Sequence, residues 1–404
     1  MAEKQNTPEI RFEGFTDPWE QRKLGNCGAT YGGLTGKTKE DFGHGNARFI
    51  PYTNVFDNPL TDTKRLAAVE IDSSQNQVAY GDVLFTVSSE TPDEVGMSSV
   101  WLSDQENVYL NSFCFGYRQD STFDPHYLAY MLRSSSVRSN LALLAQGISR
   151  FNISKNKVME LTVPVPSAVE QKELGQYFTK LDHLITLHQR KHDKLCTVKK
   201  SMLDKMFPKP GETEPEIRFK GFTDPWEQRK LGEVAHRVIR KNEGNQSDLP
   251  LTISAQHGLV DQRDYFNSQV ASRDMSGYYL LENGEFAYNK STSADSPWGA
   301  IKRLTKYEKG CLSTLYICFR LDQGDPEFLV TYYETNRWHG AVQMIAAEGA
   351  RNHGLLNIAP DDFFETALTL PCSTEEQRQI GCFFTQLNSL ITLHQREPRF
   401  ADTG

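Results

Sequence analysis

The sequence has no long hydrophobic run and no secretory start. No stretch of about 18 apolar residues occurs in the 404 residues, so no transmembrane helix is expected. Met1-Ala-Glu-Lys4 lacks the basic-then-apolar pattern of a signal peptide. The seven cysteines are scattered, odd in number and form no Cys-x-x-Cys pair, which argues against a disulfide framework and against a zinc site. These absences predict a cytoplasmic protein with reduced thiols.

Catalytic motifs are missing as well. Gly36-Lys37-Thr38 ends like a phosphate-binding P-loop, but Tyr31 occupies the position of the required earlier glycine. The zinc-protease, serine-hydrolase and dinucleotide-binding motifs do not occur. Asp17-Pro-Trp19, Asp124-Pro-His126 and Asp224-Pro-Trp226 lack the second proline of the strand end found in base-modifying amino-methyltransferases. The sequence therefore predicts that the chain itself has no catalytic residues.

Neither the overall charge nor the histidines point to a ligand directly. A formal net charge of −8 gives no sign of nucleic-acid binding. If the chain binds DNA, its basic residues must gather on one face, or a partner must share the phosphates. His188 and His192 have the four-residue spacing that could hold zinc, but they lie on a helix seam, where packing is the simpler interpretation. No metal site is predicted.

What the sequence does contain is an internal repeat. Residues 8–25 return at 215–232 with one difference, Glu13 against Lys220. The seven residues 184–190 are identical to residues 390–396. A period this long indicates a tandem duplication of one domain, because solenoid repeats are much shorter. Each copy consists of an opening motif, a variable body and a helical pattern.

Each helical pattern has the heptad spacing of a seam that faces another helix. The first spans 167–207, opens with a capping box formed by Ser167 and Glu170, and stops before Pro208. The second spans 373–397 and stops at Pro398. The main seam positions are Leu174, Phe178, Leu181, Ile185, His188, His192, Leu195, Lys199, Met202 and Met206 in the first helix, and Ile380, Phe384, Leu387, Ile391 and His394 in the second. The partner of the first helix is expected to be its own shortened copy.

The two bodies, 26–166 and 233–372, share a layout but little residue identity. Strand patterns dominate each body and one helical pattern interrupts them, so we expect an α+β fold with two similar mixed α/β domains. The strand patterns include Ala47–Val55, Val108–Tyr117 and Cys311–Leu321, and the helical patterns are Pro125–Leu144 and Pro326–Ala347. The opening motifs and helical patterns of the two copies are nearly constant, which indicates that both copies dock in the same way. The bodies between them have diverged, which indicates that they act on two different targets.

Hydroxyl, amide and basic side chains cluster after several predicted strands in both bodies. Such groups hold phosphates and read base edges in DNA. The alternative for any single residue is ordinary loop polarity, so the argument depends on their paired placement. Trp19 and Trp226 lie in the repeated frame and are expected to be packing anchors. The candidate DNA-binding residues are Lys37, Thr38, Thr53, Asn54, Ser88, Ser89, Ser149, Arg150 and Asn152 in the first body, and Arg240, Lys241, Ser254, Lys290, Ser291, Arg351 and Asn352 in the second.

These motifs together resemble the specificity subunit of type I restriction-modification enzymes. The resemblance covers essentially the whole chain, in the order domain, helix, domain, helix. It rests on the opening Phe-x-Gly-Phe-x-x-x-Trp-Glu-x-x-Lys-Leu-Gly at 12–25 and 219–232, on Gly-Asp-Val-Leu-Phe-Thr at 81–86, on Pro-x-x-x-Glu-Gln at 166–171, and on Leu-Asp-x-Leu-Ile-Thr-Leu-His-Gln-Arg-Lys at 181–191.

The resemblance implies a DNA-recognition function without catalysis. Each body would be a target recognition domain that reads one half of a bipartite sequence in the major groove of double-stranded DNA. The helices would pack antiparallel as a spacer, giving the chain a pseudo-two-fold internal repeat. Two methyltransferase subunits and restriction/translocase subunits would be partners, with S-adenosylmethionine, ATP and Mg bound by them rather than by this chain. The implied domains are 1–166, the spacer helix 167–207, 208–372, the shortened helix 373–397 and the tail 398–404.

The second helix departs from the pattern because it is shorter than the first. From this difference we expect the far end of the first helix, Leu195 to Met206, to lack a partner within the chain. The N-terminal segment or a partner subunit could fill it, or the gene product could be shortened. Two other functions stay open on the residues alone: a scaffold whose bodies bind proteins, and an enzyme with a site that no motif reveals.

Overall fold

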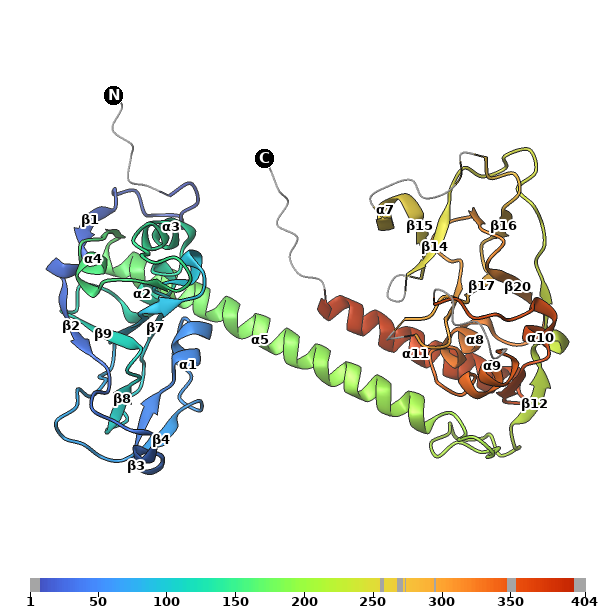
Figure 1. The fold of residues 1–404 in the computed structure, drawn as a ribbon, viewed down its shortest axis with the longest axis horizontal. Coiled ribbons are helices and arrows are strands. Elements are labelled where there is room, and N and C mark those ends of the chain that lie inside the picture. The colour runs from blue at the N-terminus through green and yellow to red at the C-terminus, as the bar shows by residue number, and fades with distance from the viewer. Residues whose placement is uncertain are drawn as a thin grey trace. The chain divides into compact units, whose positions relative to one another are not determined.

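In the computed structural model, residues 8–254, 258–266, 272, 274–293, 296–346 and 354–395 are described. The chain divides into two compact units, Met1–Thr186 and Leu187–Gly404. Both mix strands and helices, as the pattern predicts (Figure 1). Helix α5 (Ala168–Lys205) begins in the first unit and ends in the second, and it confirms the long helix expected over 167–207. None of the helices in the described ranges is long and apolar enough to cross a membrane.

The first unit is built around a four-stranded antiparallel sheet in the order β2-β9-β5-β7, with a second sheet in the order β4-β3-β8 beside it. Its buried core includes Phe85 and Phe115, whose rings stack 5.0 Å apart. Besides α5, the strands and helices are β1 (Glu20–Lys23), β2 (Gly28–Gly32), β3 (Phe42–Ile50), α1 (Tyr52–Asp57), β4 (Ala67–Val69), β5 (Val83–Thr86), β6 (Ser88–Ser89), β7 (Ser98–Val100), β8 (Val108–Leu110), β9 (Cys114–Gln119), α2 (Pro125–Met131), α3 (Ser135–Leu143), β10 (Phe151–Asn152), α4 (Lys155–Met159) and β11 (Thr162–Val165).

The second unit repeats this main sheet in the order β13-β20-β17-β18. Phe286 and Phe319 stack 5.1 Å apart in its core, as the equivalent pair does in the first unit. The elements are β12 (Glu227–Lys230), α6 (Leu231–Val234), β13 (Ala235–Arg237), β14 (Leu251–Ser254), β15 (Gly258–Asp261), α7 (Gln262–Phe266), β16 (Tyr279–Glu282), β17 (Phe286–Asn289), β18 (Ala300–Arg303), β19 (Lys309–Leu312), β20 (Ile317–Leu321), α8 (Pro326–Tyr332), α9 (His339–Ile345), α10 (Pro360–Phe364), β21 (Ala367–Leu370) and α11 (Thr374–Gln395).

The repeated opening motif does the same structural work in both units. Strand β1 pairs antiparallel with β11, and β12 pairs in the same way with β21. Arg11 donates two hydrogen bonds to the carboxylate of Glu170, at 2.7 and 2.8 Å, and Arg218 donates two to Glu376, at 2.7 and 2.9 Å. Both glutamates are 1% exposed. A motif that must tie a strand and an arginine to the start of a helix tolerates little change.

Ser167 and Glu170 form only part of the expected capping box. The Ser167 hydroxyl accepts a hydrogen bond from the Glu170 N–H at 3.3 Å, which satisfies one free donor of the helix start. The Glu170 carboxylate, however, is held by Arg11 and by the indole N–H of Trp19. Trp226, the repeat equivalent of Trp19, is buried in the core of the second unit. Both tryptophans are therefore packing anchors, as predicted.

Several predicted strands and helices turn out shorter because side chains interrupt them. Val108–Tyr117 is two strands, since the Asn111 side chain accepts from the Phe113 N–H and forms a turn. Cys311–Leu321 is likewise two strands, with a turn at Ser313. Strand Ala47–Val55 ends at Ile50, because Pro51 cannot continue the ladder and starts α1 instead.

Both predicted helices in the bodies are broken in two. Pro125–Leu144 is interrupted at Arg133, whose guanidinium donates to the backbone carbonyls of Val55, Phe56, Asn58 and Ser98. Pro326–Ala347 is interrupted where the Thr335 hydroxyl bonds the carbonyl of Tyr332. These contacts come from segments distant in sequence or from local side-chain bonds, so helical periodicity does not reveal them.

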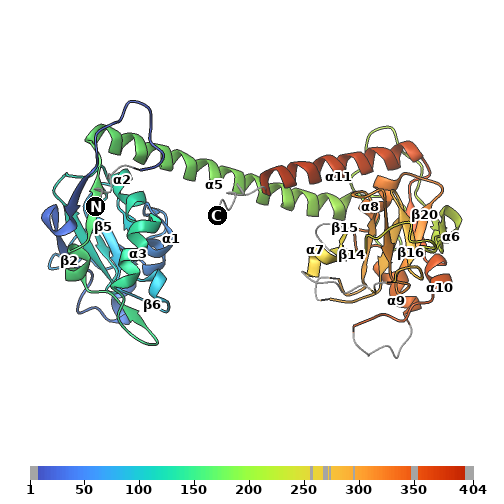
Figure 2. The ribbon, with the colours of Figure 1, turned by 90° about the horizontal axis from the view of Figure 1, so that it is seen from above.

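Helices α5 and α11 pack antiparallel in the second unit (Figures 1 and 2). His188 lies opposite His394, and the ring of Phe207 lies 6.2 Å from that of Phe384. Leu195, Cys196, Met202 and Leu203 pack against the core of this unit, and Met206 is buried in it. The prediction that Leu195 to Met206 lack a partner is therefore wrong. The body of the second unit, together with α11, covers this end of α5.

The seam positions differ between the two helices. In α11, Ile380, Phe384, Leu387 and Ile391 are all buried. In the first half of α5, Leu174 packs partly against the first core and Phe178 lies beside Tyr130, with 5.5 Å between ring centres. Leu181 is partly exposed and Ile185 is 51% exposed. Equal heptad spacing thus leads to unequal burial, because burial depends on what lies opposite.

Candidate nucleic-acid interface

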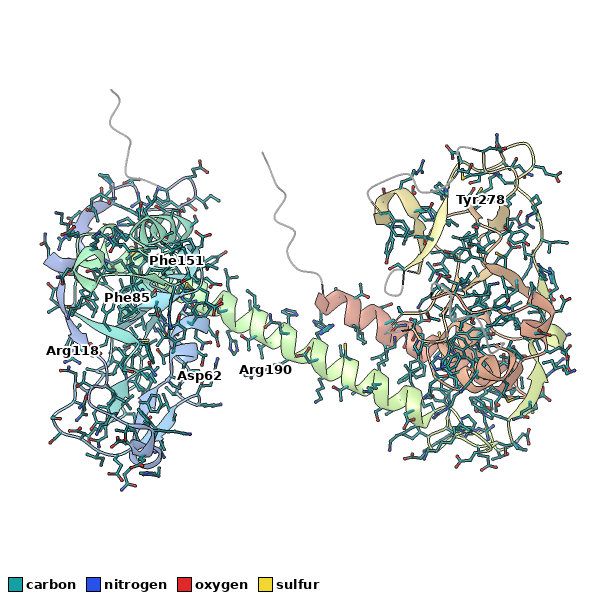
Figure 3. All side chains as sticks on the ribbon, viewed as in Figure 1. Asp62, Phe85, Arg118, Phe151, Arg190 and Tyr278 are labelled. Carbon is teal, nitrogen blue, oxygen red and sulfur yellow. The ribbon has the colours of Figure 1, made fainter. Side chains whose placement is uncertain are left out.

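In the first unit, two of the predicted polar segments lie side by side. Strand β6 pairs with β10, which places Ser88 opposite Asn152 and Ser89 opposite Phe151. Phe151 packs against the core cluster that contains Phe85 (Figure 3), so the pairing is fixed from the interior. The segment before β10 folds back as a loop, closed by the backbone pair of Gln146 and Asn152.

This loop depends on Gly147. Its φ of +142° lies in a region that side-chain-bearing residues rarely adopt. A Cβ added there would lie 2.1 Å from the carbonyl oxygen of Arg150. The tight loop that follows leaves Ile148, Ser149 and Arg150 exposed to solvent. These are positions from which side chains can reach a ligand.

The loop borders a cleft of about 740 Å³. The cleft brings together five of the nine candidates in the first body, from three segments far apart in sequence. Sequence reasoning missed the other lining residues, although Tyr52 and Phe56 carry the i,i+4 spacing of one helix face. The predicted members are Thr53, Ser88, Ser89, Ser149 and Arg150; the others are Tyr52, Phe56, Glu90, Glu94 and Phe113.

Hydrogen bonds organise the cleft around the two serines. Arg150 donates to the Ser88 hydroxyl at 3.2 Å, and the Ser89 hydroxyl donates to the carboxylate of Glu94 at 3.0 Å. The Tyr52 hydroxyl donates to the Ser88 carbonyl at 2.6 Å, and burial raises the pKa of Tyr52. Within the described ranges Arg150 forms no ion pair, so most of its donors remain available. The cleft therefore presents a guanidinium, hydroxyls and carboxylates beside the half-exposed ring of Phe113.

Three other candidates in the first body are engaged in the fold instead. Lys37 forms an ion pair with Asp72 at 2.8 Å, and this contact holds the pKa of that carboxyl well below its usual range. Thr38 caps a short turn through Asp41. Asn54 is fully buried, and its amide donates to the carbonyls of Asp62 and Arg65. The structure does not bring these residues into the cleft.

The second unit places its equivalent segments together in the same way. Ser291 forms an isolated antiparallel β-bridge with Leu355, and the Thr292 N–H donates to the Gly354 carbonyl at 2.6 Å. Lys290 donates to the Ile358 carbonyl at 3.3 Å, and burial lowers its pKa. Arg351 and Asn352 lie outside the described residues. The end of the β17 segment thus meets residues 354–358, as β6 meets β10.

The remaining candidates of the second body have partners of their own. Arg240 bonds the buried carboxylate of Glu285 at 2.9 Å. Lys241 donates to the Gly277 carbonyl and lies 4.2 Å from the ring centre of Tyr279. Ser254 is buried on β14.

No metal or disulfide chemistry accompanies these sites. All seven cysteines, each within a described range, are free thiols. Across the described part of the chain, no three His, Cys, Asp or Glu side chains are grouped so that they could hold a metal ion. What the two units present is hydrogen-bonding and charged groups on exposed segments.

Comparison with known proteins finds similarity to one family. Residues 16–196 match the model of the type I restriction modification DNA specificity domain. A putative type I restriction enzyme MjaX specificity subunit from Methanocaldococcus jannaschii is 25% identical over 216 residues, 51% of this chain and 49% of that protein. The type I restriction enzyme StySPI specificity subunit from Salmonella potsdam is 26% identical over 157 residues, 38% of this chain and 33% of that protein. The chain thus matches about half of one relative's length and a third of the other's.

The fold agrees with these matches. The crystal structure of a type I restriction-modification S subunit from M. genitalium aligns over 96% of this chain and 94% of that chain, with a TM-score of 0.52 and 14% identity. At this identity the likeness shows the fold alone. The family model and the two relatives agree: the chain is similar to specificity subunits of type I restriction-modification systems, and its fold is like that of a solved S subunit.

Proposed function

We propose that this chain is the non-catalytic DNA-recognition subunit of a type I restriction-modification complex. Each body reads one half of a bipartite target through the major groove of double-stranded DNA. The chain positions two methyltransferase subunits and the restriction/translocase subunits on that target. S-adenosylmethionine, ATP and Mg belong to these partners, and the complex works in the cytoplasm.

One observation carries the proposal above the others: the convergence of polar segments in both units. Ser88 and Ser89 pair with the strand that follows the loop with Ser149 and Arg150, and Ser291 forms a β-bridge with Leu355. Side chains of this kind contact base edges and phosphates. The frames around the bodies are nearly identical, whereas the bodies have diverged. That combination suits two readers with different targets and one common mode of docking.

We assign the recognition domains to residues 1–166 and 208–372. The helices at 167–207 and 373–397 then serve as the spacer, and 398–404 is a tail. Two readers on such a spacer suit half-sites that lie a helical turn of about 34 Å or more apart. The antiparallel packing of α5 on α11 in the second unit supports this role. A net charge of −8 is compatible with DNA binding when partner subunits share the phosphates.

A domain exchange tests the proposal. Residues 26–166 are replaced by the corresponding body of another specificity subunit, and the modified bases of genomic DNA are mapped with the methyltransferase present. We expect one half of the methylated sequence to change and the other half to stay. The matched control replaces residues 233–372 and changes only the opposite half. If either exchange altered both halves, or if neither altered any, independent reading would be wrong.

A binding measurement separates this function from a protein-binding scaffold. The chain with its methyltransferase should bind duplex DNA with an affinity that falls steeply as salt rises, because phosphate contacts release counterions. Absence of salt-sensitive duplex binding, with the complex intact, would favour the scaffold instead.

A further inference from the structure

The second unit contains a cleft that none of the candidate DNA-binding residues lines. It has a volume of about 1110 Å³ and lies between the last turns of α5, the segment after α8 and the side of α11. A smaller cleft of about 540 Å³ adjoins it and shares Lys302, Asn388 and Thr392 with it. Cavities of roughly 300–1,000 Å³ commonly hold small ligands or parts of larger ones.

Lys302 lies where the two clefts meet. It sits on β18, where it pairs with Ala287 of the neighbouring strand. Among the described residues, none gives its ammonium a hydrogen bond or an ion pair. Burial lowers the pKa of Lys302, and the nearby Lys199 adds to this effect while Glu334 opposes it. A partly buried ammonium without a partner costs free energy, so its position calls for an anion from outside.

The side chains that line the cleft around Lys302 carry more positive than negative charge. Lys199 is already paired with Glu334 at 2.8 Å, and Asp204 is paired with Arg337 at 3.1 Å. Lys200 and Lys302 line the cleft in addition, and within the described ranges neither forms an ion pair with a carboxylate. Neutral donors complete the lining and could bond the oxygens of an anion. They are Ser201, Asn336 and Asn388, whereas the hydroxyls of Thr197, Thr335 and Thr392 donate to backbone carbonyls.

We propose that this cleft binds a phosphate group, with the Lys302 ammonium as its central donor. Lysine acts on phosphate as a compact point charge, and hydroxyl and amide groups on α5 and α11 satisfy the remaining oxygens. Phosphate fits better than a carboxylate, because donors converge on the cleft from α5, β18 and α11. Two sources present this chemistry: a free phosphate-bearing molecule, and a phosphodiester of the DNA backbone.

Thermal unfolding of the full-length chain in inorganic phosphate tests the site. Phosphate is titrated against sodium chloride at matched ionic strength, so that general screening cancels. We expect phosphate to raise the melting temperature of the unmodified chain through ligand linkage. Lys302→Met should weaken the apparent affinity about tenfold or more, as expected for loss of a charge-assisted bond. Lys194→Met, which removes an exposed lysine of α5 outside the cleft, should leave the affinity unchanged.

Two outcomes would overturn the site: no phosphate-specific shift in the unmodified chain, or an equal shift in Lys302→Met. Because loss of a partly buried charge can itself alter folding, the ³¹P resonance of inorganic phosphate provides a second readout. It should broaden on addition of the unmodified chain and sharpen again when excess pyrophosphate competes. An unbroadened resonance contradicts the proposal whatever the variant does.

Duplex binding then identifies the source of the phosphate. If the DNA backbone supplies it, Lys302→Met should reduce the slope of log affinity against log salt by about one, with the target sequence unchanged. If a free molecule supplies it, that slope should stay the same while the effect of inorganic phosphate is lost. Both results keep the site, and neither depends on how the bodies read their target.

Discussion

His188 and His394 face each other across the packed helices α5 and α11, with 2.9 Å between their Nδ1 atoms. They occupy the same place in the two copies of Leu-Ile-Thr-Leu-His-Gln-Arg, so the duplication brings a residue into contact with its own repeat. In this contact one Nδ1 donates and the other accepts. The contact therefore requires that the two rings are not both protonated.

Acid should loosen this helix pair. Burial, followed by the charges of Lys191, His188 and His192, lowers the pKa of His394 below its ordinary 6.5. A lowered pKa means that the unfolded chain binds more protons than the folded one once the pH drops below about 6.5. Stability should therefore fall from there towards the folded-state pKa, and it should be unaffected by this group at higher pH.

Thermal unfolding between about pH 7.5 and pH 5.5 measures this effect. His394→Gln should flatten the acid side of the profile, whereas His183→Gln, at an exposed position of α5 in the first unit, should leave it as it is. An acid-side profile that His394→Gln does not change would contradict the role of this pair.

The buried ion pairs of the frame should be needed for stability. Glu376 is 1% exposed, and Arg218→Ala leaves its carboxylate without two hydrogen bonds. Removal of one partner of a buried pair costs about 3–5 kcal/mol, because the other charge stays buried. Arg22→Ala, which breaks the exposed pair with Glu20, is the control and should cost at most about 1 kcal/mol. Denaturant unfolding compares the two, and similar losses would show that the frame pair is unimportant.

Arg150 should contribute to recognition of the first half-site. Arg150→Ala removes a guanidinium whose donors are largely free, and each specific base contact is worth about 1–3 kcal/mol of discrimination. With the methyltransferase present, we expect relaxed methylation at one position of one half-site. Lys157→Ala, an exposed basic residue on α4 that does not line the cleft, is the matched control. Equal effects of the two substitutions would assign Arg150 to general charge attraction.

Gly147 should matter for DNA binding through the shape of its loop. Gly147→Ala forces a Cβ to within 2.1 Å of the Arg150 carbonyl oxygen, so the loop must move and carry Ser149 and Arg150 with it. Gly43→Ala introduces comparable backbone strain at a φ of +89°, but in open space. We expect weaker duplex binding by the first variant alone, measured by fluorescence anisotropy. Unimpaired binding by Gly147→Ala would remove the loop from the interface.

Much of the frame could be predicted from the sequence, because its contacts are local or repeated. Both bounds of α5 lie within two residues of the predicted helix, and α11 begins one residue after its predicted start, since heptad spacing, Ser167 and Pro208 act nearby in the chain. Within the bodies, the periodicity of the sequence predicted helices that are too long, because it does not report contacts with segments distant in the chain. Residues 125–144, for example, form two helices, and Arg133 between them donates to four carbonyls of other segments.

The candidate site divides in the same way. The sequence indicated which residue types cluster after strands, and five of those residues share one cleft. It could not separate Arg150, whose donors remain available, from Lys37, which Asp72 holds in an ion pair. Partners of this kind depend on where other segments lie, which no local pattern reveals.

The long helix α5 shows which properties follow from the sequence and which follow from the tertiary structure. By itself the sequence determined that residues 168–205 form one helix with a continuous seam, because helix formation depends on neighbouring side chains and on caps. Only the tertiary structure decided that Met206 is buried and Ile185 half exposed, although both hold equivalent seam positions. The physical reason is that burial depends on the surface that lies opposite, and α11 with the second body supplies that surface at one end of the helix.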